Sequence, residues 1–475
     1  MANEQQYQTH AALPGRLVIV GFGSIGQAIL PLVLRHLGTS PDRIVIVTAD
    51  QRGREVADHY GVEFREAALT ADNYRRVLEP LVAEGDFLLN LSVDVSSTAV
   101  VELCRERGAL YLDTVVEPWG GMYFDGSLTP AQRSNYALRE GMLAVRRKLG
   151  PGPTAVSAQG ANPGIVSQLA KEAALIVARD TGLEREAPSD REGWARLFRD
   201  LGVRAIHVAE RDTQVAAQRK RPGEFVNTWS IDGFVSEGCQ PAELGWGTHE
   251  RGLPPGGARH DSGCGAAIYL NRPGAGTRVR TWTPNAGPIM GFLVTHNESI
   301  SVADYLTLRE GDSVLYRPTV HYAYHPCDDA VLSVHELAGR GWRQQEEQRL
   351  LVEEITDGMD ELGVLLMGHA KGAFWYGSQL TIQQARELCP FNSATSLQVA
   401  AGALGGMVWA IENPAAGVVE ADDLDYRRVL EIARPYLGPV VGAYTSWTPL
   451  ADRGRLFPED VDASDPWQFK NVLAA

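Results

Sequence analysis

The sequence contains few lysines and no closely spaced cysteines. Only five of its 44 lysine and arginine residues are lysine, which leaves few candidates for a lysine that forms a Schiff base with a substrate. The cysteines are Cys104, Cys239, Cys264, Cys327 and Cys389. Because no CxxC pair occurs, neither a zinc knuckle nor a disulfide framework is indicated. Unpaired thiols are typical of a reducing cytoplasm.

Signals of several other protein classes are also absent. Residues 1–14 are polar and lack the basic-then-apolar pattern of a secretory signal. The most apolar run, residues 17–34, is interrupted by three glycines and a glutamine, so we do not interpret it as a membrane span. Neither a G-x-S-x-G motif nor a P-loop occurs. We therefore expect a cytoplasmic protein without a membrane partner.

The charge balance is strongly acidic, with a formal net charge of −15. An acidic surface repels nucleic acid, so we expect no nucleic-acid partner. The same charge is compatible with a cationic substrate, although solubility alone also explains it. With 475 residues, of which 44% are hydrophobic, the chain exceeds what one core accommodates, and we expect two domains.

The first 120 residues alternate short apolar runs with segments of helical period. The predicted strands are 17–20, 44–48, 87–91 and 110–113, and the predicted helices are 25–37, 51–60 and 98–107. Strands that are apolar throughout and separated by helices predict an α/β fold, a doubly wound parallel sheet of the Rossmann type.

Three segments follow from composition and turn signals. A Gly-Pro-Gly-Pro cluster at residues 150–153 marks a boundary, so we assign residues 1–155 to a Rossmann domain. Longer alternating runs predict an α+β substrate-binding and dimerisation domain over 156–390. Helical patterns over 396–412 and 423–437 predict that residues 391–475 pack back on the Rossmann domain.

A dinucleotide-binding motif follows the first predicted strand. Gly21, Gly23 and Gly26 fit G-x-G-x-x-G, with Ser24 and Ile25 between the last two. The first glycine permits a tight turn, the second allows close approach of the pyrophosphate, and the third permits helix–strand packing. The start of the helix then faces the phosphates.

An acidic residue ends the second predicted strand. Asp50 lies 24 residues beyond Gly26, where a carboxylate accepts hydrogen bonds from a ribose 2′-hydroxyl and repels a 2′-phosphate. This position favours NAD over NADP, whereas the neighbouring Arg52 and Arg54 weaken the preference.

Further polar residues follow the later strands and precede the helix at 165–178. They are Asn90, Ser92, Thr114, Glu117 and Asn162. Ligands of open parallel sheets bind at the carboxyl ends of the strands, so these residues are site candidates, and Asn90, Ser92, Thr114 and Asn162 are candidates for binding the cofactor. Each could equally be a hydrogen-bonded loop residue or, for Asn162, a helix cap.

The central region combines separated acids with tryptophan. A diamine requires carboxylates for its ammonium groups, and Glu210, Glu237, Asp360 and Glu361 are candidates. Trp229 could add a cation–π contact. Spacing alone does not distinguish these acids from a solvated face.

Histidines of the central region are candidates for proton transfer or for metal binding. His296 ends an apolar run and could be a proton shuttle or a structural histidine. His321 and His325 have i,i+4 spacing, but the stretch has a strand pattern, so no metal site is predicted.

Several segments together resemble those of bacterial homospermidine synthases, which belong to the saccharopine dehydrogenase-like group. These are residues 18–27, 113–119, 158–164, 227–230 and 317–326. The resemblance extends from about residue 15 to the C-terminal helices. The Rossmann segment is shared by many enzymes, whereas the central segments are specific.

The resemblance implies an aminobutyl transfer in which NAD acts as a redox prosthetic group. NAD⁺ takes a hydride from putrescine, the resulting imine loses ammonia, and a second putrescine forms a new Schiff base. The same bound NADH then reduces it to sym-homospermidine, with spermidine as an alternative donor. The imine joins two substrates, so no enzyme lysine is needed. The family also implies a homodimer.

The resemblance also implies roles for individual residues. Trp229 would be the cation–π platform, and Glu210 with Glu117 an inner amine site. Glu237 would bind an outer ammonium, and His296 and Asn162 would line the reaction centre.

One position departs from the family pattern. We expect aspartate where this chain has Glu361, and the additional methylene would misplace the carboxylate. Asp360 beside it is the alternative carboxylate.

Two other functions remain open. The first is another saccharopine-like reductase of the carboxynorspermidine or saccharopine type, whose substrates would require a basic cluster. The second is a catalytically silent NAD-binding regulatory protein, in which Trp229 and the acids would not be clustered.

Overall fold

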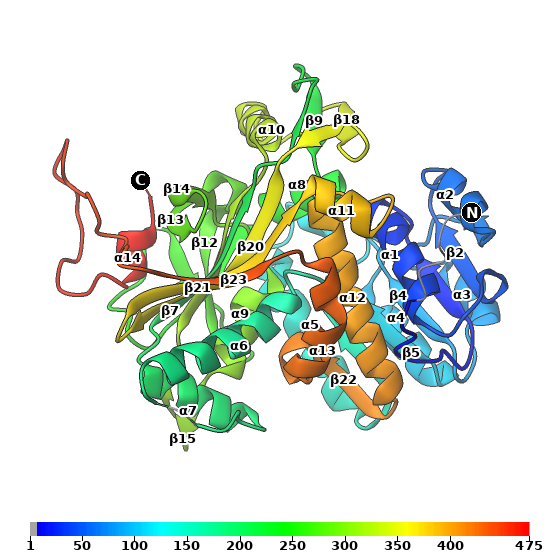
Figure 1. Cartoon of the computed structure of the whole chain (residues 1–475), viewed down its shortest axis with the longest axis horizontal. Coiled ribbons are helices and arrows are strands. Elements are labelled where there is room, and N and C mark those ends of the chain that lie inside the picture. Colours follow the sequence, from blue (N-terminus) through cyan, green and yellow to red (C-terminus); the bar gives the residue numbers. More distant parts are fainter. Residues whose placement is uncertain (1–6, 184, 475) are drawn as a thin grey trace. The chain divides into compact units, whose positions relative to one another are not determined.

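The computed structural model describes residues 7–183 and 185–474, which form two compact units (Figure 1). The first unit comprises the chain up to Met122, Gly141–Ile165 and Gln383–Leu437. The second comprises Tyr123–Glu140, Val166–Ile382 and the chain from Gly438 onward.

A seven-stranded parallel sheet forms the centre of the first unit, in the order β22-β6-β5-β4-β1-β2-β3. Its strands are β1 (Leu17–Val20), β2 (Ile44–Thr48), β3 (Glu63–Glu66), β4 (Phe87–Asn90), β5 (Leu110–Asp113), β6 (Gly152–Ser157) and β22 (Ala416–Glu420). The strand order reverses at β1, which pairs with both β2 and β4. This reversal is where ligands of such sheets bind. The predicted α/β fold with a doubly wound parallel sheet is confirmed.

The first unit also contains helices from two distant parts of the chain. The helices are α1 (Ser24–His36), α2 (Arg54–Tyr60), α3 (Tyr74–Leu78), α4 (Ser97–Arg107), α12 (Ala394–Glu412) and α13 (Tyr426–Ala433), with α5 (Asn135–Leu149) at the boundary. Of these, α12 and α13 come from late in the chain. Helix α12 is apolar and long enough to cross a membrane, but 83% of its apolar window is buried inside the protein. It packs against α1 and β5, which makes it a core helix.

The second unit contains a ten-stranded mixed sheet, with the main order β11-β12-β10-β17-β7-β20-β21-β23. The strands are β7 (Ala205–Asp212), β10 (Pro241–Gly245), β11 (Gly257–Arg259), β12 (Ala267–Pro273), β13 (Arg278–Thr283), β14 (Gly287–Phe292), β17 (Thr319–His325), β20 (Met359–His369), β21 (Gly372–Thr381) and β23 (Val440–Thr445). Paired short strands are β8 (Val215–Ala216) with β19 (Ile355–Asp357), β9 (Glu224–Asn227) with β18 (Glu347–Leu350), and β15 (Leu308–Glu310) with β16 (Ser313–Tyr316).

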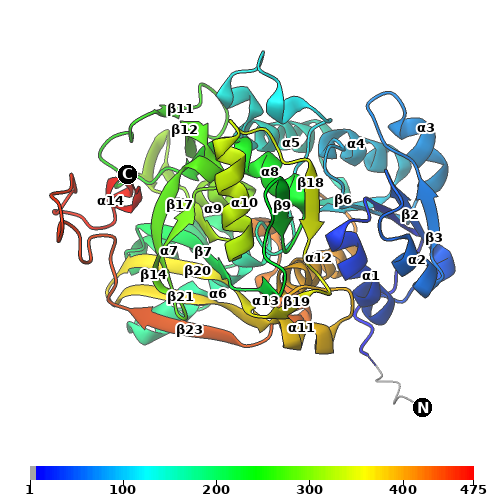
Figure 2. The ribbon, with the colours of Figure 1, turned by 90° about the horizontal axis from the view of Figure 1, so that it is seen from above.

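Helices surround this second sheet. They are α6 (Ile165–Asp180), α7 (Arg191–Leu201), α8 (Ile231–Cys239), α9 (Asn297–Tyr305), α10 (Asp328–Gly339) and α14 (Phe469–Val472), with α11 (Ile382–Leu388) at the boundary. Figure 2 shows α10 beside β9 and β18, and the Val226 backbone donates to Ser333 Oγ at 2.9 Å. Helix α8, which follows β9, therefore begins from a strand that is fixed on both edges.

The segment that we assigned as 391–475 is divided between the two units. Residues up to Leu437 belong with the first sheet, but the chain from Gly438 belongs with the second. The reason is β23, which pairs antiparallel with β21. Its sequence, Val-Val-Gly-Ala-Tyr-Thr, is rich in β-branched residues, and our assignment of this segment to C-terminal helices on the Rossmann domain was wrong there.

Candidate functional site

The three glycines after β1 differ in how much space a side chain would find at each position. Gly21 has φ +84°, and a β-carbon there would lie 2.7 Å from the Ser92 backbone. A β-carbon at Gly26 would lie 2.8 Å from the Gly21 carbonyl oxygen. At Gly23, by contrast, it would meet no described atom within 4 Å. Folding therefore requires Gly21 and Gly26, whereas Gly23 leaves open space that a ligand can enter.

The start of α1 offers unused hydrogen-bonding groups. The hydroxyl oxygen of Ser24 is buried and has no hydrogen-bond partner among the described residues. Ile25 is half-buried in the same first turn, and no side chain caps the helix at Gly23. Free N–H groups and the helix dipole favour an anion here, so the site fits a pyrophosphate.

Asp50 follows β2, which ends at Thr48, and is partly exposed. Its carboxylate accepts from the Arg52 backbone at 2.8 Å and from the Arg52 guanidinium at 2.9 Å. These hydrogen bonds lower the pKa of Asp50. The Arg54 guanidinium lies over the Phe64 ring, 4.6 Å from its centroid. Both arginines thus have protein partners, while the Asp50 oxygens keep lone pairs for a ribose hydroxyl.

Asn90 and Ser92 shape the loop after β4. The buried Asn90 side chain accepts from the Ser92 backbone N–H at 3.3 Å and donates to the Tyr111 hydroxyl at 3.3 Å. The Ser92 backbone in turn faces Gly21. The side chain of Asn90 therefore fixes a loop that borders the glycine turn.

The residues after β5 and β6 form a second border. Buried Glu117 accepts from the Asp94 backbone at 3.4 Å, and its own backbone N–H donates to Ser97 Oγ at 3.0 Å. Thr114 lies beside Gly160, at the start of the tight loop that carries half-buried Asn162.

A buried aspartate connects these two strands. Asp113 accepts from the Tyr111 hydroxyl at 2.7 Å and from the Ala158 backbone at 2.6 Å. Burial raises the pKa of Asp113 to about 6, and the hydrogen bonds oppose that shift. Its role is to join β5 to the loop before Asn162.

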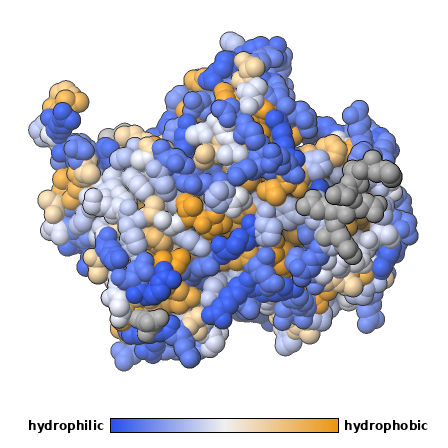
Figure 3. Space-filling view, viewed as in Figure 1, coloured by the Kyte–Doolittle hydropathy of each residue, from blue (hydrophilic) through white to orange (hydrophobic). Residues whose placement is uncertain are grey.

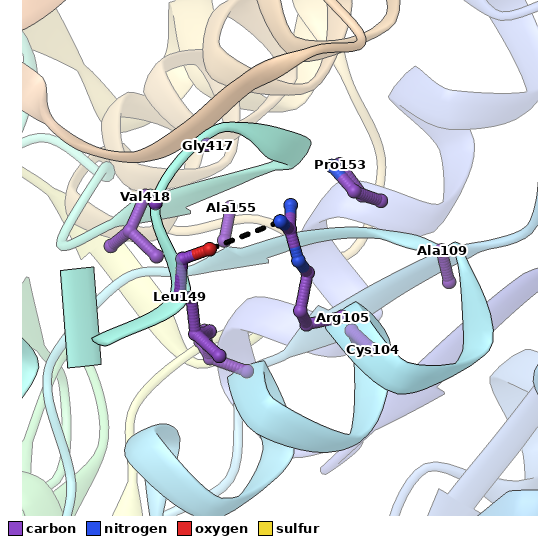
Figure 4. A pocket seen from close by; sticks show the side chains of 10 residues that line it. Cys104, Arg105, Ala109, Leu149, Pro153, Ala155, Gly417 and Val418 are labelled. Carbon is purple, nitrogen blue, oxygen red and sulfur yellow. Dashed lines mark hydrogen bonds between the residues drawn. The ribbon is translucent and has the colours of Figure 1, made fainter. Parts of the chain in front are cut away.

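A small cavity elsewhere in the first unit is not a candidate site. It encloses about 10 Å³ next to Arg105, whose guanidinium donates to the Leu149 carbonyl at 3.1 Å (Figure 4). This is room for about one water molecule. Among the described residues, no group of three or more His, Cys, Asp or Glu side chains is arranged to hold a metal ion.

The strand register places several predicted residues of the second unit on one face of its sheet. Glu210 on β7 is opposite Tyr324 on β17 and Leu362 on β20. Two residues along, Asp212 is opposite Asp360. Directly paired residues share a face, and side chains alternate with period two. Glu210, Asp212, Asp360 and Tyr324 therefore face the same side, and the three carboxylates all raise the pKa of the buried Tyr324 hydroxyl, after the effect of burial itself.

Trp229 joins this face through a hydrogen bond. Its indole N–H donates to the Tyr324 hydroxyl at 3.0 Å. Phe234 from α8 contacts both rings, with centroids 5.6 Å from Trp229 and 5.5 Å from Tyr324. The indole is therefore held in one orientation beside the carboxylates.

A second tyrosine links Glu210 to His296. The Tyr322 hydroxyl donates to Glu210 at 2.6 Å, and its ring stacks on Tyr324 at 5.1 Å. The same ring lies 4.3 Å from the His296 ring. Glu210, Trp229 and His296 thus belong to one aromatic–carboxylate network.

His296 lies between two glutamates. Its Nε2 is 3.1 Å from Glu237 on α8 and its Nδ1 is 3.2 Å from Glu298 on α9. Burial alone lowers the pKa of His296, but the two carboxylates outweigh it and raise that pKa to about 10. His296 is therefore an imidazolium at neutral pH, unlike the neutral imidazole that a general base requires.

The structure separates Asp360 from Glu361. Asp360 shares the face of Glu210, whereas Glu361 points to the other side of β20. There its carboxylate accepts from Gln379 Nε2 at 2.8 Å and from the Asn285 backbone at 3.2 Å. Glu361 is therefore not brought together with the other predicted residues.

Four residues of the network were not predicted from the sequence. They are Asp212, Glu298, Tyr322 and Tyr324. The alternation of Tyr322 and Tyr324 along β17, and of Glu210 and Asp212 along β7, was a usable signal. Glu298 follows His296 within the first turn of α9 and gave no comparable signal.

Comparisons with known proteins agree along the whole chain. Residues 17–156 match the saccharopine dehydrogenase NADP binding domain, and residues 160–444 match the saccharopine dehydrogenase C-terminal domain. The structure resembles the crystal structure of homospermidine synthase from Legionella pneumophila in complex with NAD, with a TM-score of 0.91 and 48% identity over 98% of both chains. The predicted NAD-binding Rossmann domain is confirmed.

Two relatives that match along their full length are also homospermidine synthases. Homospermidine synthase of Blastochloris viridis is 59% identical over 97% of this chain and 98% of its own. That of Mesorhizobium japonicum is 52% identical over 100% of this chain and 99% of its own. With this identity over the full length, the chain belongs to the homospermidine synthase family, as the resemblance of its central segments predicted.

Proposed function

We propose that this protein is a homospermidine synthase that joins two putrescine molecules, or takes an aminobutyl group from spermidine, with release of ammonia. The observation that carries the proposal is the buried aromatic–carboxylate network of the second unit, in which Trp229 and three carboxylates face one side of the sheet. A dicationic substrate requires this combination of negative charge and an indole face.

The first unit supplies the cofactor site. We assign the pyrophosphate to Gly23, Ser24 and the start of α1, and the ribose to Asp50, with Gly21 and Gly26 shaping the turn. When bound, NAD supplies a hydride acceptor and afterwards a hydride donor. Asn90, Ser92 and Thr114 border this site, and Glu117 and Asn162 are proposed as further residues of the reaction centre.

The carboxylates of the second unit bind and stabilise cationic amines. Glu210, Asp212 and Asp360 are each at most 2% exposed, so water would screen a negative charge on them little, while burial raises the pKa of Asp212. A cationic iminium between the two substrates gains more from such fixed charges than a neutral amine does. Trp229 is proposed to steer the cation, since Tyr324 holds its indole in place.

His296 and its two glutamates are proposed as the outer ammonium site. Glu237, whose carboxylate lies 3.1 Å from His296 Nε2, supplies the carboxylate of that site. It can therefore attract one further ammonium group. His296 keeps a proton at both ring nitrogens and orients Glu237 rather than accepting a proton from the substrate.

The same proposal implies the binding partners and the location of the protein. The substrates are putrescine and spermidine, and a second copy of the chain completes a homodimer. A cytoplasmic location gives access to these polyamines.

The test is product analysis by mass spectrometry after incubation with putrescine and a tenfold smaller amount of NAD⁺. We expect homospermidine in excess of the NAD⁺ supplied, with no steady increase in NADH absorbance. Absence of homospermidine here, with NADH consumed in a parallel assay to which a carboxylate-bearing carbonyl substrate is added, would instead favour a saccharopine-like reductase. Tight NAD binding without any product would favour the regulatory alternative.

A further inference from the structure

A chain of buried hydrogen bonds crosses the first sheet from the end of β4, through β5, to the residue after β6. The Ser92 backbone N–H donates to Asn90 Oδ1 at 3.3 Å, and Asn90 Nδ2 donates to the Tyr111 hydroxyl at 3.3 Å. That hydroxyl donates to Asp113 Oδ2 at 2.7 Å, and Asp113 Oδ1 accepts from the Ala158 backbone N–H at 2.6 Å. We name the side chains of Asn90, Tyr111 and Asp113 the relay.

Burial distinguishes the relay from the charges on the surface of the same unit. Around α3 the surface is hydrophilic (Figure 3), and there Arg75 pairs with the exposed Glu106 on α4 at 2.7 Å. Water competes for such a pair, so its net contribution is small. The three side chains of the relay are at most 3% exposed, so water does not compete for their hydrogen bonds and each bond strengthens the next.

The relay ends at a residue in an unfavourable backbone conformation. Ala158 has a φ of +57°, a left-handed conformation in which the β-carbon of an L-residue is crowded. Two successive backbone N–H groups of this turn donate to Asp113. That of Ala158 reaches its carboxylate, and that of Gln159 reaches its carbonyl oxygen at 2.9 Å. Asp113 therefore holds the turn through both its side chain and its main chain.

The loop after Ala158 is closed on itself and fixed to α12. The Gly160 N–H donates to the Pro163 carbonyl at 2.7 Å, and the Ile165 N–H donates back to the Gly160 carbonyl at 3.0 Å. Gln159 Nε2 donates to the Gly402 carbonyl of α12 at 3.1 Å. Because the loop has one closed shape, its direction relative to β5 is set at Ala158, and with it the position of Asn162.

The other end of the relay lies at the glycine turn. A β-carbon at Gly21 would lie 2.7 Å from the backbone of Ser92, the residue whose N–H begins the relay. One set of side chains therefore connects the border of the glycine turn with the loop that carries Asn162.

We propose that Asp113 is a positioning residue of the reaction centre, which holds Ala158 in its left-handed conformation and thereby directs the loop that presents Asn162. The place of Asn162 in the reaction centre rests on the function proposed above, whereas the holding of the loop does not.

The first test is Asp113→Asn in the full-length protein. The amide keeps the shape of the carboxylate but replaces one of its two acceptor oxygens with a donor, so it cannot accept from both Ala158 and Tyr111. We expect kcat for putrescine to decrease at least tenfold, with KM and the affinity for NAD changed less than threefold. Assays of product formation and NAD titrations measure these quantities.

A second substitution tests whether the effect passes through Ala158. Glycine adopts the left-handed conformation without a steric cost, so it needs less support from Asp113. The decrease in kcat caused by Asp113→Asn should therefore be at least threefold smaller in a chain that also carries Ala158→Gly. General destabilisation would not be relieved in this way, because glycine also increases the entropy of the unfolded chain.

Asp86→Asn is the matched control. Asp86 is buried just before β4, at the opposite end of the strands, and accepts from the backbone N–H groups of Arg16 at 2.6 Å and Ala83 at 2.8 Å. This variant should lower the melting temperature to a similar extent as Asp113→Asn and change kcat less than twofold.

Hydrogen exchange of the backbone provides a measurement that does not depend on activity. Asp113→Asn should increase the exchange rate of residues 158–165 at least tenfold, and Asp86→Asn should leave it unchanged. If the unmodified chain forms no homospermidine, the proposed function fails, and exchange alone then decides whether Asp113 holds the loop. Unchanged exchange in Asp113→Asn, or a decrease in kcat no larger than that of Asp86→Asn, would overturn the proposal.

Discussion

The glycine turn of the first unit and the aromatic–carboxylate network of the second are built by different means. The turn lies within six residues, and two of its three glycines are required by contacts of the protein's own backbone. The network draws on β7, α8, α9, β17 and β20, which are separated by up to 150 residues and brought together by strand register. The turn is therefore sensitive to backbone geometry and the network to side-chain chemistry.

The largest expected effect is on the network. Trp229→Ala should lower kcat/KM for putrescine at least 100-fold, because it removes the indole face and leaves the Tyr324 hydroxyl without its donor. The affinity for NAD should change less than twofold. Parallel turnover assays and NAD titrations measure both quantities.

Trp282→Ala is the matched control, because Trp282 is partly buried in a different cluster of the same unit. Equal losses of turnover and NAD affinity in Trp229→Ala would show that the residue only supports the fold.

The next effect distinguishes the two faces of β20. Asp360→Asn should lower kcat/KM for putrescine about 100-fold, whereas Glu361→Gln should change it less than threefold, because its side chain lies on the opposite face. Glu361→Asp should bring no gain in turnover. The reverse order, with Glu361 the sensitive position, would refute the assignment of faces.

Two further substitutions distinguish the roles of Gly21 and Gly23 in the glycine turn. Gly21→Ala should destabilise the protein by several degrees in a thermal melt without NAD, because the left-handed conformation and the Ser92 backbone exclude a side chain. Gly23→Ala should leave that melt unchanged and weaken NAD binding about tenfold. Loss of stability in both variants would mean that Gly23 also serves folding.

A smaller effect is expected at the ribose. Asp50→Ala should weaken NAD binding a few-fold and reduce the discrimination against NADP, because the 2′-hydroxyl loses its acceptor and a 2′-phosphate is no longer repelled. Titration with both cofactors measures this. An unchanged ratio of the two affinities would reject Asp50 as the ribose ligand.

The smallest effect concerns stability and pH. The pKa of His296 is raised from 6.5 to about 10, so its stabilising contribution is complete below pH 6.5 and is lost as the pH rises through 10. In urea unfolding between pH 6 and 10, the difference in stability between the unmodified chain and His296→Gln should decrease as the pH rises. A constant difference would indicate that His296 is not charged in the folded protein.

The sequence predicted those features that depend on residues close together in the chain. The first two apolar strands, the glycine turn and Asp50 all lie within one βαβ unit, where spacing carries the information. The strand order around β22 and the course of the chain after Gly438 were not predicted, because they depend on pairing between segments far apart.

The network was predicted in part, and its composition explains why. Trp229, Glu210, Glu237 and His296 were candidates by residue type, but spacing did not distinguish them from other residues, and their individual roles came from the resemblance to a family. Asp212 and Tyr324 alternate with Glu210 and Tyr322 along their own strands, but only the register of β7, β17 and β20 shows that the strands bring them to one face, since a shift of one residue places the opposite set of side chains there. The choice between Asp360 and Glu361 depends on the same register.

The late strand β22 has a consequence for synthesis of the protein. It pairs with β6, although about 260 residues separate the two strands in the chain, and α12, which precedes it, packs on β5. Domains generally fold in order as they leave the ribosome. Here the sheet of the first unit keeps an unpaired edge until the second unit has been translated as far as Ile382 and α12 has followed it, so chains terminated before residue 416 should lack a complete first domain even though their glycine turn is intact.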